Sequence, residues 1–331
     1  MNCDGHFFRG KNILITGGLG FIGSSLAIAL VEQGANVTIL DSMIPGFGGN
    51  FFNIDSIHSQ VHVNISDMRD PTSLDTIVKD KEYIFHLAGQ VSHGDSMRYP
   101  KLDLNVNCVS TMNLLESCRC YNLETRLIYT STRQVYGITN QLPVSEDLAA
   151  TPIDVNGINK LAAEYYHLLY DRTYGLRSTV LRLTNTYGPR QQIRNDRQGF
   201  IGIFLRMALK GENIKIFGTG QQVRDFNYIS DVVDALLLSA MTCDCYGNIY
   251  NLGSPNFYSM LEFAGVLESL CGTQYEIVPF PEDKKIIDIG DYYGDYSKFT
   301  KATGWHPQVD LKEGIQNSIE FLSKHKKEYW A

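Results

Sequence analysis

The chain contains 331 residues, of which 44% are hydrophobic, and carries a formal net charge of −7. A chain of this length can bury a sizeable core, as one large α/β unit or as two joined domains, without disulfides or metals to stabilise it. The acidic balance, with lysines and arginines dispersed along the chain, argues against nucleic acid as a partner.

Cysteine spacing and hydropathy exclude further classes of protein. The two close pairs among the seven cysteines, Cys118/Cys120 and Cys243/Cys245, lack the C-x-x-C spacing of common zinc sites. We therefore expect reduced, packed thiols and no metal. No segment has the apolar run of a signal peptide, and none approaches the roughly 18 apolar residues of a membrane-spanning helix. These features predict a soluble, cytoplasmic protein with no membrane partner.

In the first half of the chain, short apolar runs alternate with segments of helical periodicity. The strand-like runs, each bounded by Gly, Asp, Asn or Ser, cover residues 12–16, 36–40, 83–88, 126–131 and 179–183. Helix-period spacing of apolar residues covers 24–33, 107–120 and 157–172. This alternation predicts a Rossmann-type, doubly wound α/β fold, in which helices cover both faces of a parallel sheet.

After about residue 185 the pattern becomes irregular, with strand-like runs at 214–217 and 275–278. Helical segments are expected near 200–210, 231–241 and 259–271. We therefore expect a first domain of residues 1–185, to which a segment of about 221–250 returns, and a smaller C-terminal α/β lobe of residues 186–220 and 251–331. No low-complexity linker separates the two, so their boundary should be a cleft.

A glycine-rich turn joins the first predicted strand to the first predicted helix. Gly17, Gly20 and Gly23 allow a tight turn and the close approach of a pyrophosphate, while the helix N-terminus offers free N–H groups. Asp41 ends the second strand, where a carboxylate would accept both ribose hydroxyls of NAD and repel a 2′-phosphate. A purely structural turn is the alternative. The complete strand, turn and helix context favours NAD, and the first domain is then its binding domain.

Three segments together resemble a known family. They are "TGGLGFIG", with the spacing G-x-x-G-x-x-G, "HLAGQ" at 86–90 and "YTSTRQVYG" at 129–137. The chain resembles the extended short-chain dehydrogenases and, more narrowly, the NAD-dependent sugar-nucleotide epimerase/dehydratase family that includes UDP-galactose 4-epimerase. The resemblance runs from residue 11 to about 305. The residues it implies at NAD are Gly17, Gly20, Phe21, Ile22, Gly23, Asp41, Asp67, Met68, Leu87, Ala88, Gly89, Asn107, Thr130 and Lys160.

The second lobe shares two further segments with this family, "LRLTNTYGPR" and "IKIFGTGQQVRDFNYISDV". By this resemblance, Asn185 and Arg224 hold the diphosphate of a nucleoside-diphosphate sugar, and the segment around Gly199 and Phe200 covers its base. A guanidinium suits phosphate oxygens because it forms two-pronged, charge-assisted hydrogen bonds. The alternative is that Arg224 only pairs with the neighbouring Asp225.

Two lysines stand where the family usually has a phosphate-binding arginine. They are Lys284 and Lys285 in "PEDKKIIDIGDYYGD". Either can substitute as a point charge on the phosphates. The base of the nucleotide is left open by this difference.

The expected active-site helix departs from the family at one position. Family members oxidise a sugar hydroxyl, usually at C4, by passing hydride to NAD, and a tyrosine in Y-x-x-x-K takes the proton. Lys160 is present in "NGINK", but Asn156 occupies the tyrosine position. A carboxamide orients a hydroxyl without deprotonating it at neutral pH. Lys160 can still bind the nicotinamide ribose, and Thr132 occupies the Ser/Thr position that reaches the sugar.

The residues after Thr132 bear on the reaction. Dehydratases of the family carry an Asp-Glu pair there, and decarboxylases a Glu at the second place, whereas this chain has Arg133 and Gln134. Without that glutamate, proton abstraction at C5 has no obvious agent. A 4-epimerase needs no such acid, because its ketone only rotates and takes the hydride back on the other face. Epimerisation at C4 is therefore the leading prediction.

Another group must then accept the hydroxyl proton. His93 in "QVSHGDS" falls in the loop after the run at 83–88, which borders the sugar in the family, and an imidazole exchanges protons near pH 7. Asp95 and Tyr187 are weaker candidates. A further possibility is loss of the proton through water and the ribose to Lys160. A structural or surface role for His93 is the alternative.

Two other functions stay open. One is an unconventional dehydratase or a net dehydrogenase that leaves a keto sugar and NADH. The other is a non-catalytic protein that binds NAD and a nucleotide sugar, and Asn156 motivates it. In either case the resemblance implies a homodimer that packs the helices at 107–120 and 157–172 into a four-helix bundle.

Overall fold

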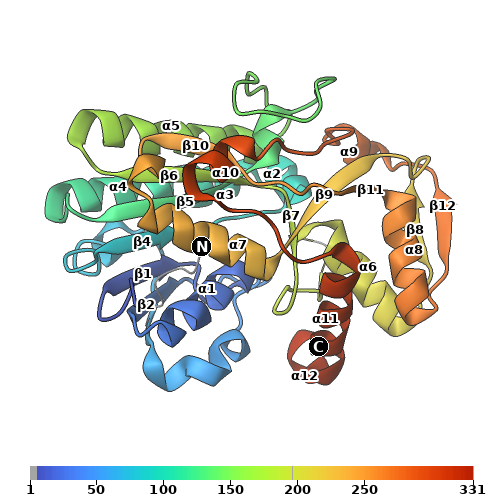
Figure 1. The fold of residues 1–331 in the computed structure, drawn as a ribbon, viewed down its shortest axis with the longest axis horizontal. Coiled ribbons are helices and arrows are strands. Elements are labelled where there is room, and N and C mark those ends of the chain that lie inside the picture. The colour runs from blue at the N-terminus through green and yellow to red at the C-terminus, as the bar shows by residue number, and fades with distance from the viewer. Residues whose placement is uncertain (1–5, 196, 331) are drawn as a thin grey trace.

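The computed structural model describes residues 6–195 and 197–330 (Figure 1). Its large sheet has seven strands in the order β10-β6-β5-β4-β1-β2-β3, and every neighbouring pair is parallel. The strands are β1 (Asn12–Thr16), β2 (Asn36–Asp41), β3 (His62–Ile65), β4 (Tyr83–His86), β5 (Arg126–Thr132), β6 (Ser178–Leu183) and β10 (Asn248–Asn251). All five strands expected for the first half are confirmed.

Helices cover both faces of this sheet, because neighbouring residues of each strand point to opposite sides. In β1, Ile13 and Ile15 pack into the core beneath α1 (Phe21–Glu32) and α7 (Ile229–Met241). Leu14 points the other way, into the core beneath α4 (Ser110–Tyr121) and α5 (Val155–Tyr174). The Rossmann-type fold predicted from the sequence is confirmed.

The second lobe lies beyond the carboxyl ends of the strands, to the right in Figure 1. It contains a three-stranded sheet in the order β11-β9-β7 and a parallel pair of β12 with β8. Its strands are β7 (Asn185–Tyr187), β8 (Ile214–Phe217), β9 (Val223–Tyr228), β11 (Phe257–Ser259) and β12 (Tyr275–Val278). Its helices α6 (Gly199–Lys210), α8 (Met260–Cys271) and α11 (Leu311–Lys324) share one apolar core.

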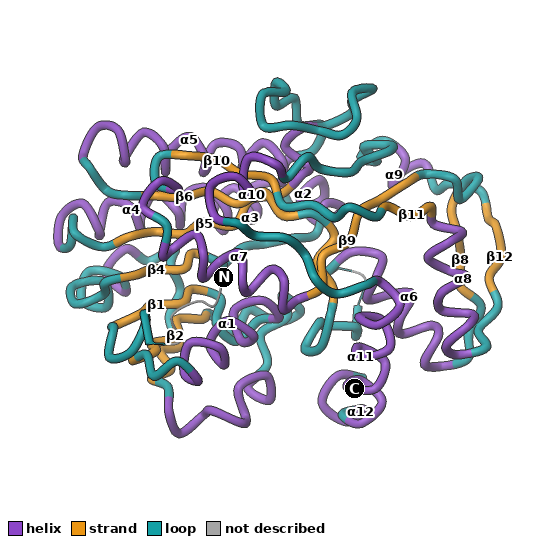
Figure 2. The backbone as a smooth tube through the Cα atoms, viewed as in Figure 1, coloured by secondary structure: helices purple, strands orange, loops and turns teal. Residues whose placement is uncertain are grey.

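Short helical segments connect these elements (Figure 2). They are η1 (Phe51–Gln60), η2 (Pro71–Ser73), α2 (His93–Arg98), α3 (Pro100–Leu104), η3 (Asn105–Val109), η4 (Arg133–Tyr136), η5 (Cys243–Cys245), α9 (Glu282–Lys285), α10 (Ser297–Thr303) and α12 (Lys326–Tyr329). The π-helical η3 runs directly into α4.

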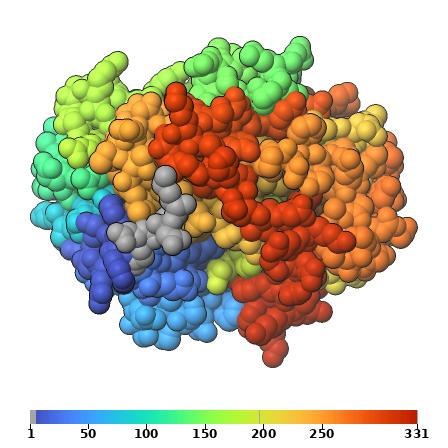
Figure 3. All heavy atoms as spheres, in the orientation of Figure 1, coloured from blue at the N-terminus to red at the C-terminus, as the bar shows by residue number. Residues whose placement is uncertain are grey.

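The two lobes exchange segments of chain. The returning segment expected at about 221–250 does bring α7 and β10 back to the large sheet, whereas β9 pairs with β7 and β11 in the second lobe. Phe299 and Trp305, beyond residue 251, also pack into the core beneath α1 and α7. Figure 3 shows the C-terminal residues, in red, lying across the junction of the lobes on the face drawn.

Within the described residues, no helix has the length and apolar character needed to span a bilayer. The same residues hold no group of three or more His, Cys, Asp or Glu side chains arranged to bind a metal. The described cysteines form no disulfides. The expectation that all of them are packed is wrong for Cys120 and Cys243, which are exposed.

Candidate active site

A cavity of about 1180 Å³ lies between the two lobes. It begins at the carboxyl ends of β1, β2, β4 and β5, where open α/β sheets bind their ligands, and extends to α6 and β8 of the second lobe. Thirteen of the fourteen residues expected at NAD line it, and Asn107 does not. The cavity therefore joins the predicted cofactor site to the predicted substrate site.

Gly17 and Gly23 allow the close backbone contacts that shape the turn between β1 and α1. Gly17 has a φ of +70°, and a Cβ there would lie 2.9 Å from the Cα of Ala88. A Cβ on Gly23 would lie 2.3 Å from the carbonyl oxygen of Gly17. Gly20 caps α1 without a side-chain hydrogen bond, so the first N–H groups of the helix face the cavity uncapped. This cradle fits the pyrophosphate of NAD.

Asp41 and Asp67 flank the expected adenosine site. The two carboxylate oxygens of Asp41 accept hydrogen bonds from the backbone N–H groups of Leu19, at 3.1 Å, and Met43, at 2.9 Å. Burial raises the pKa of Asp41, and these two bonds oppose the rise. The guanidinium of Arg69 bonds the carboxylate of Asp67 and lowers its pKa. Both carboxylates line the cavity.

Asn107 lies behind the cavity wall. Its Oδ1 accepts from the N–H of Gln90 at 3.0 Å, and its Nδ2 donates to the carbonyl oxygen of Gln90 at 3.0 Å. A Cβ on Gly89 would lie 2.8 Å from the same Oδ1. Asn107 thus fixes the backbone after β4, and any influence on a bound dinucleotide passes through Gly89 and Gln90.

Lys160 is a buried residue in the floor of the cavity. Its Nζ donates to the carbonyl oxygen of Thr130 at 3.1 Å and lies 4.9 Å from the ring centre of Tyr129. Burial lowers the pKa of Lys160 to about 8, while Asp103 and Glu164 oppose the fall. The ammonium also lies 3.1 Å from the place of a Cβ on Gly89, so only a glycine there leaves this side chain its position.

Thr132 and Gln134 stand at the end of β5. The hydroxyl oxygen of Thr132 accepts the N–H of Gln134 at 3.2 Å, which caps η4 and leaves its proton free to donate. The Nε2 of Gln134 donates to Asp154 at 2.8 Å and to the carbonyl oxygen of Ile287 at 3.0 Å. Gln134 therefore ties the floor of the cavity to the second lobe.

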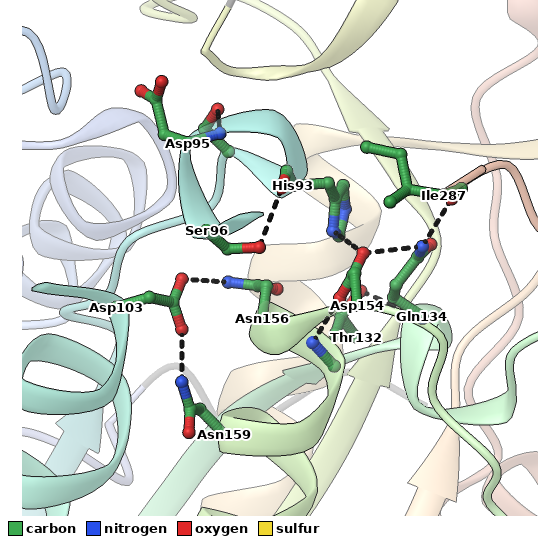
Figure 4. Close-up of polar contacts among 12 residues, drawn as sticks. His93, Asp95, Ser96, Asp103, Thr132, Gln134, Asp154, Asn156, Asn159 and Ile287 are labelled. Carbon is green, nitrogen blue, oxygen red and sulfur yellow. Dashed lines mark hydrogen bonds and ion pairs between the residues drawn. The ribbon is translucent and has the colours of Figure 1, made fainter. Parts of the chain in front are cut away.

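Asn156 is held by a buried network (Figure 4). Its Nδ2 donates to the carbonyl oxygen of Gln90 at 2.8 Å and to Asp103 Oδ2 at 3.2 Å. Asp103 has no exposed surface, and its other oxygen accepts from Asn159 Nδ2 at 2.7 Å. Because the amide nitrogen is occupied, only the Oδ1 of Asn156 is left to meet a ligand in the cavity that this residue lines.

His93 meets a carboxylate that the sequence analysis missed. Its Nδ1 lies 2.9 Å from Oδ2 of Asp154, at an angle that does not align a hydrogen bond. Asp154 caps α5, with Oδ1 accepting the N–H of Gly157 at 2.6 Å. His93 begins α2, so its expected place in a loop is wrong. An aspartate just before a helical pattern indicates a cap, but no local signal pairs it with His93.

The weaker proton acceptors are less well placed. Asp95 lines the cavity, but its carboxylate is engaged by Arg197 at 2.9 Å. Tyr187 is buried outside the cavity wall, its hydroxyl facing the carbonyl oxygen of Leu311, and burial raises its pKa. His93, in contrast, lines the cavity beside Thr132 and Asn156.

The second lobe presents cations to the cavity. The guanidinium of Arg224 lies 2.9 Å from Asp288, and the suggested pairing with Asp225 is wrong. Asp225 instead accepts hydrogen bonds from the hydroxyl of Thr184 and the N–H of Gly294. Arg133 lines the same cavity, and burial together with the charge of Arg224 lowers the pKa of Arg133 to about 10.

The other expected substrate residues divide into lining and non-lining positions. Asn185, Gly199 and Phe200 line the cavity. Lys284 also lines it, with its Nζ 5.1 Å from the ring centre of Phe217, whereas Lys285 does not. Of these two lysines, Lys284 is the one placed to meet a ligand.

Known proteins match this chain through both lobes. The model of a family described as "NAD dependent epimerase/dehydratase family" matches residues 13–253. A putative UDP-glucose 4-epimerase of Methanocaldococcus jannaschii is 34% identical over 95% of this chain and 99% of the relative. A CDP-paratose 2-epimerase of Salmonella typhi is 32% identical over 94% of this chain and 99% of the relative. The solved UDP-glucose 4-epimerase of Thermotoga maritima with UDP-glucose has a TM-score of 0.88 at 32% identity, covering 95% of this chain and 99% of that one.

Proposed function

We propose that this chain, which belongs to the NAD-dependent epimerase/dehydratase family, epimerises a nucleoside-diphosphate sugar at C4. The observation that carries the proposal is the single cavity shared by the glycine turn, Thr132, Lys160 and Arg224. A sugar whose diphosphate lies at Arg224 is thereby brought to the residues expected at the nicotinamide.

The residues present fit NAD, which is the cofactor of the family. Gly17, Gly20 and Gly23 would hold its pyrophosphate, Asp41 its adenosine ribose and Lys160 its nicotinamide ribose. Bound there, NAD supplies a reversible hydride acceptor. The chain itself must hold the sugar, orient the reacting hydroxyl and exchange its proton.

Two hydrogen-bonding groups are available to orient that hydroxyl. Thr132 has a free hydroxyl proton, and Asn156 has a free amide oxygen. Thr132 can donate to the sugar oxygen, and Asn156 Oδ1 can accept from the hydroxyl of the bound alcohol before the O–H bond turns toward a base. Neither side chain titrates near neutral pH. Thr132 can donate to the sugar oxygen in both the alcohol and the ketone state, whereas Asn156 Oδ1 can bind only the alcohol, because it accepts and does not donate.

The polar groups near the sugar favour epimerisation over loss of water. Gln134 stands where dehydratases carry glutamate, and its amide nitrogen donates hydrogen bonds to Asp154 and to the carbonyl oxygen of Ile287. Asp154 itself does not line the cavity. Of the carboxylates that do line it, Asp95 is engaged by Arg197 and Asp288 by Arg224, which makes them poor agents for abstraction at C5. Two relatives with 4-epimerase names support the same choice.

The test is an NMR time course with UDP-, GDP-, CDP- and dTDP-sugars, with absorbance recorded in the NADH band. We expect one sugar to equilibrate with its C4 epimer without build-up of NADH. Inversion at C2, the position named for the Salmonella typhi relative, would replace C4 in the proposal. A keto sugar with NADH would indicate a dehydrogenase, and a keto sugar that has lost water would indicate a dehydratase.

Lys160→Met separates the enzyme from a non-catalytic binding protein. Because Lys160 is buried in the floor of the cavity, a methionine keeps the volume and removes the charge. Loss of turnover with retained folding supports the enzyme. If the wild-type protein holds NAD and alters no sugar, and the variant has the same biological output, the binding protein is correct.

A further inference from the structure

We infer that His93 and Asp154 form the proton-accepting pair of this site, with His93 Nε2 receiving the hydroxyl proton and Asp154 positioning the ring. The inference rests on the proposed function and deepens it. Its starting point is the substitution at Asn156, whose amide nitrogen is committed to Gln90 and Asp103. A carboxamide held in this way restrains a hydroxyl and takes no proton from it.

His93 is placed to meet the same hydroxyl. It lies at the first residue of α2, and its side chain is one-third exposed while the side chain of Asp154 is fully buried. Nδ1 faces the carboxylate, and no described residue bonds Nε2. Figure 4 shows His93 and Asp154 beside Thr132 and Asn156. Since His93 lines the cavity, Nε2 is the ring nitrogen left to meet a ligand there.

Asp154 is fixed independently of His93. Its two oxygens accept from the N–H of Gly157 and from Nε2 of Gln134 at 2.8 Å. The N-terminus of the 20-residue helix α5 favours a negative charge at this cap. A carboxylate anchored in this way is a rigid acceptor for the Nδ1 proton, and it leaves Nε2 as the basic nitrogen of the neutral ring.

The 2.9 Å contact is not aligned as a hydrogen bond. Catalytic hydrogen bonds are often misaligned in ligand-free sites and tighten when substrate binds. Because Gln134 and Gly157 hold the carboxylate in place, alignment requires movement of the imidazole alone.

The proton balance of the step is complete. Oxidation of the ring carbinol breaks one C–H and one O–H bond and forms the C=O double bond. The hydride is taken by the nicotinamide cofactor, and the proton from oxygen passes to His93 Nε2. When the ketone is reduced on its other face, Nε2 returns the proton to the new alkoxide oxygen, so the pair ends as it began.

Kinetics of matched variants test the proton transfer. For His93→Ala we expect kcat to fall about 10²- to 10⁴-fold with KM little changed, the range for loss of a general base. Added imidazole should restore part of the rate, because a structural histidine would not be rescued in this way. His58→Ala is the control, since His58 is exposed on η1 and does not line the cavity.

Asp154→Ser tests the positioning role without removing the helix cap. A serine can still accept the N–H of Gly157, but it offers no carboxylate to His93. We expect kcat to fall roughly 10- to 100-fold with KM little changed, since a positioning partner typically contributes less than the base itself. Circular dichroism should show that the variant keeps its fold.

Nitrogen NMR of histidine provides a readout that needs no turnover. With ¹⁵N-labelled histidine, the signals of His93 are those lost in His93→Ala. In the wild-type protein the neutral ring should carry its proton on Nδ1, and in Asp154→Ser the two tautomers should become mixed. The same tautomer ratio in both proteins would overturn the positioning role.

The failures of the two proposals are distinguishable. A wild-type protein that epimerises a sugar, together with a His93→Ala variant of unchanged kcat, overturns the pair and leaves the function standing. That result would point to Lys160 as the proton acceptor through the ribose. A wild-type protein that converts no sugar overturns the function and the proton transfer together, while the tautomer measurement still decides whether Asp154 orients His93.

Discussion

At the scale of single residues, our proposal gives Asn156 and His93 separate parts of the role that the family resemblance assigns to one tyrosine. Asn156 is fixed by Gln90 and Asp103 and offers an oxygen to the cavity, whereas His93 offers a nitrogen that can be protonated. The two side chains should therefore respond differently to replacement.

We expect His93→Asn to cost much more activity than Asn156→Ala. The first change removes the imidazole that we propose as the proton acceptor, and kcat should fall about 10²-fold or more. The second removes one hydrogen bond to substrate, worth about 1 kcal/mol or roughly fivefold. Steady-state rates of the two purified variants give the comparison, and the reverse order would contradict the division of roles.

Asp103 should contribute to stability through the two amides that it accepts. In Asp103→Ala the Nδ2 of Asn159 loses its described acceptor, which costs about 1–3 kcal/mol, whereas the Nδ2 of Asn156 keeps its bond to the carbonyl oxygen of Gln90. Urea denaturation should show a lower midpoint than for the wild-type protein. Glu124→Ala is the control, because Glu124 is exposed and should leave the midpoint unchanged. An unchanged midpoint for Asp103→Ala would show that the network adds nothing to stability.

Lys160 should make stability depend on pH above neutrality. Burial lowers its pKa from 10.5 in the unfolded chain to about 8, so the unfolded state binds more protons between these values. Stability from this group is therefore lowest below pH 8 and rises as pH increases from about 8 to 10.5. The difference in unfolding free energy between wild type and Lys160→Met should shift in favour of wild type across that range. A difference that is constant with pH would contradict the lowered pKa.

At the scale of elements, the turn between β1 and α1 is the most constrained part of the cofactor site. Gly17→Ala places a Cβ 2.9 Å from the Cα of Ala88 and holds alanine at a φ of +70°. The backbone conformation alone costs roughly 1–2 kcal/mol, and the turn must open to relieve the contact. We expect most bound NAD to be lost, as measured by cofactor released from the purified protein. Gly265→Ala in α8 meets no atom within 4 Å and should leave NAD content unchanged.

Several elements that the sequence predicts have burial that is visible in local spacing, although α11, whose buried residues also recur at helical spacing, is not among them. β1, with its buried apolar residues, and α5, with its helical periodicity, have patterns that a short window contains. β3 and β10 were missed because half or more of their residues are only partly buried or exposed, and pairing with a neighbouring strand defines them. The same holds for β7 and β11 of three residues each.

The candidate site divides in the same way. The glycine turn, Asp41 and Lys160 sit at characteristic spacings, and the structure brings them to one cavity. Asp103 and Asp154 had no such signal. Asp103 reaches Asn156 across 53 residues of sequence, and Asp154 meets His93 only because α2 folds against the start of α5. Contacts of this kind are created by tertiary packing, and no local pattern in the sequence indicates them.

At the scale of the whole molecule, the two lobes are joined across the cavity by specific bonds. Gln134 of the first lobe donates to the carbonyl oxygen of Ile287, and Asp95 pairs with Arg197. Both links border the expected sugar site, so the position of the second lobe and the geometry around His93 depend on each other. The active site therefore belongs to neither lobe alone.

The outer surface of α4 and α5 predicts a homodimer. Large apolar side chains are exposed there, including Ile158 at 53%, Tyr165 at 59% and Leu169 at 40% on α5. These three positions, spaced by seven and four residues, share one face of the helix. An apolar face of this kind is covered at low cost by the same face of a second copy, which would form a four-helix bundle.

Light scattering after size exclusion tests this dimer. We expect the mass of two chains for the wild-type protein and of one chain for Tyr165→Glu, because a carboxylate buried at the centre of the shared face would have no partner. Ile277→Glu is the matched control: Ile277 is 57% exposed on β12, at the opposite end of the molecule from α4 (Figure 1). A wild-type protein with the mass of one chain, or a Tyr165→Glu protein with the mass of two, would exclude this face as the interface.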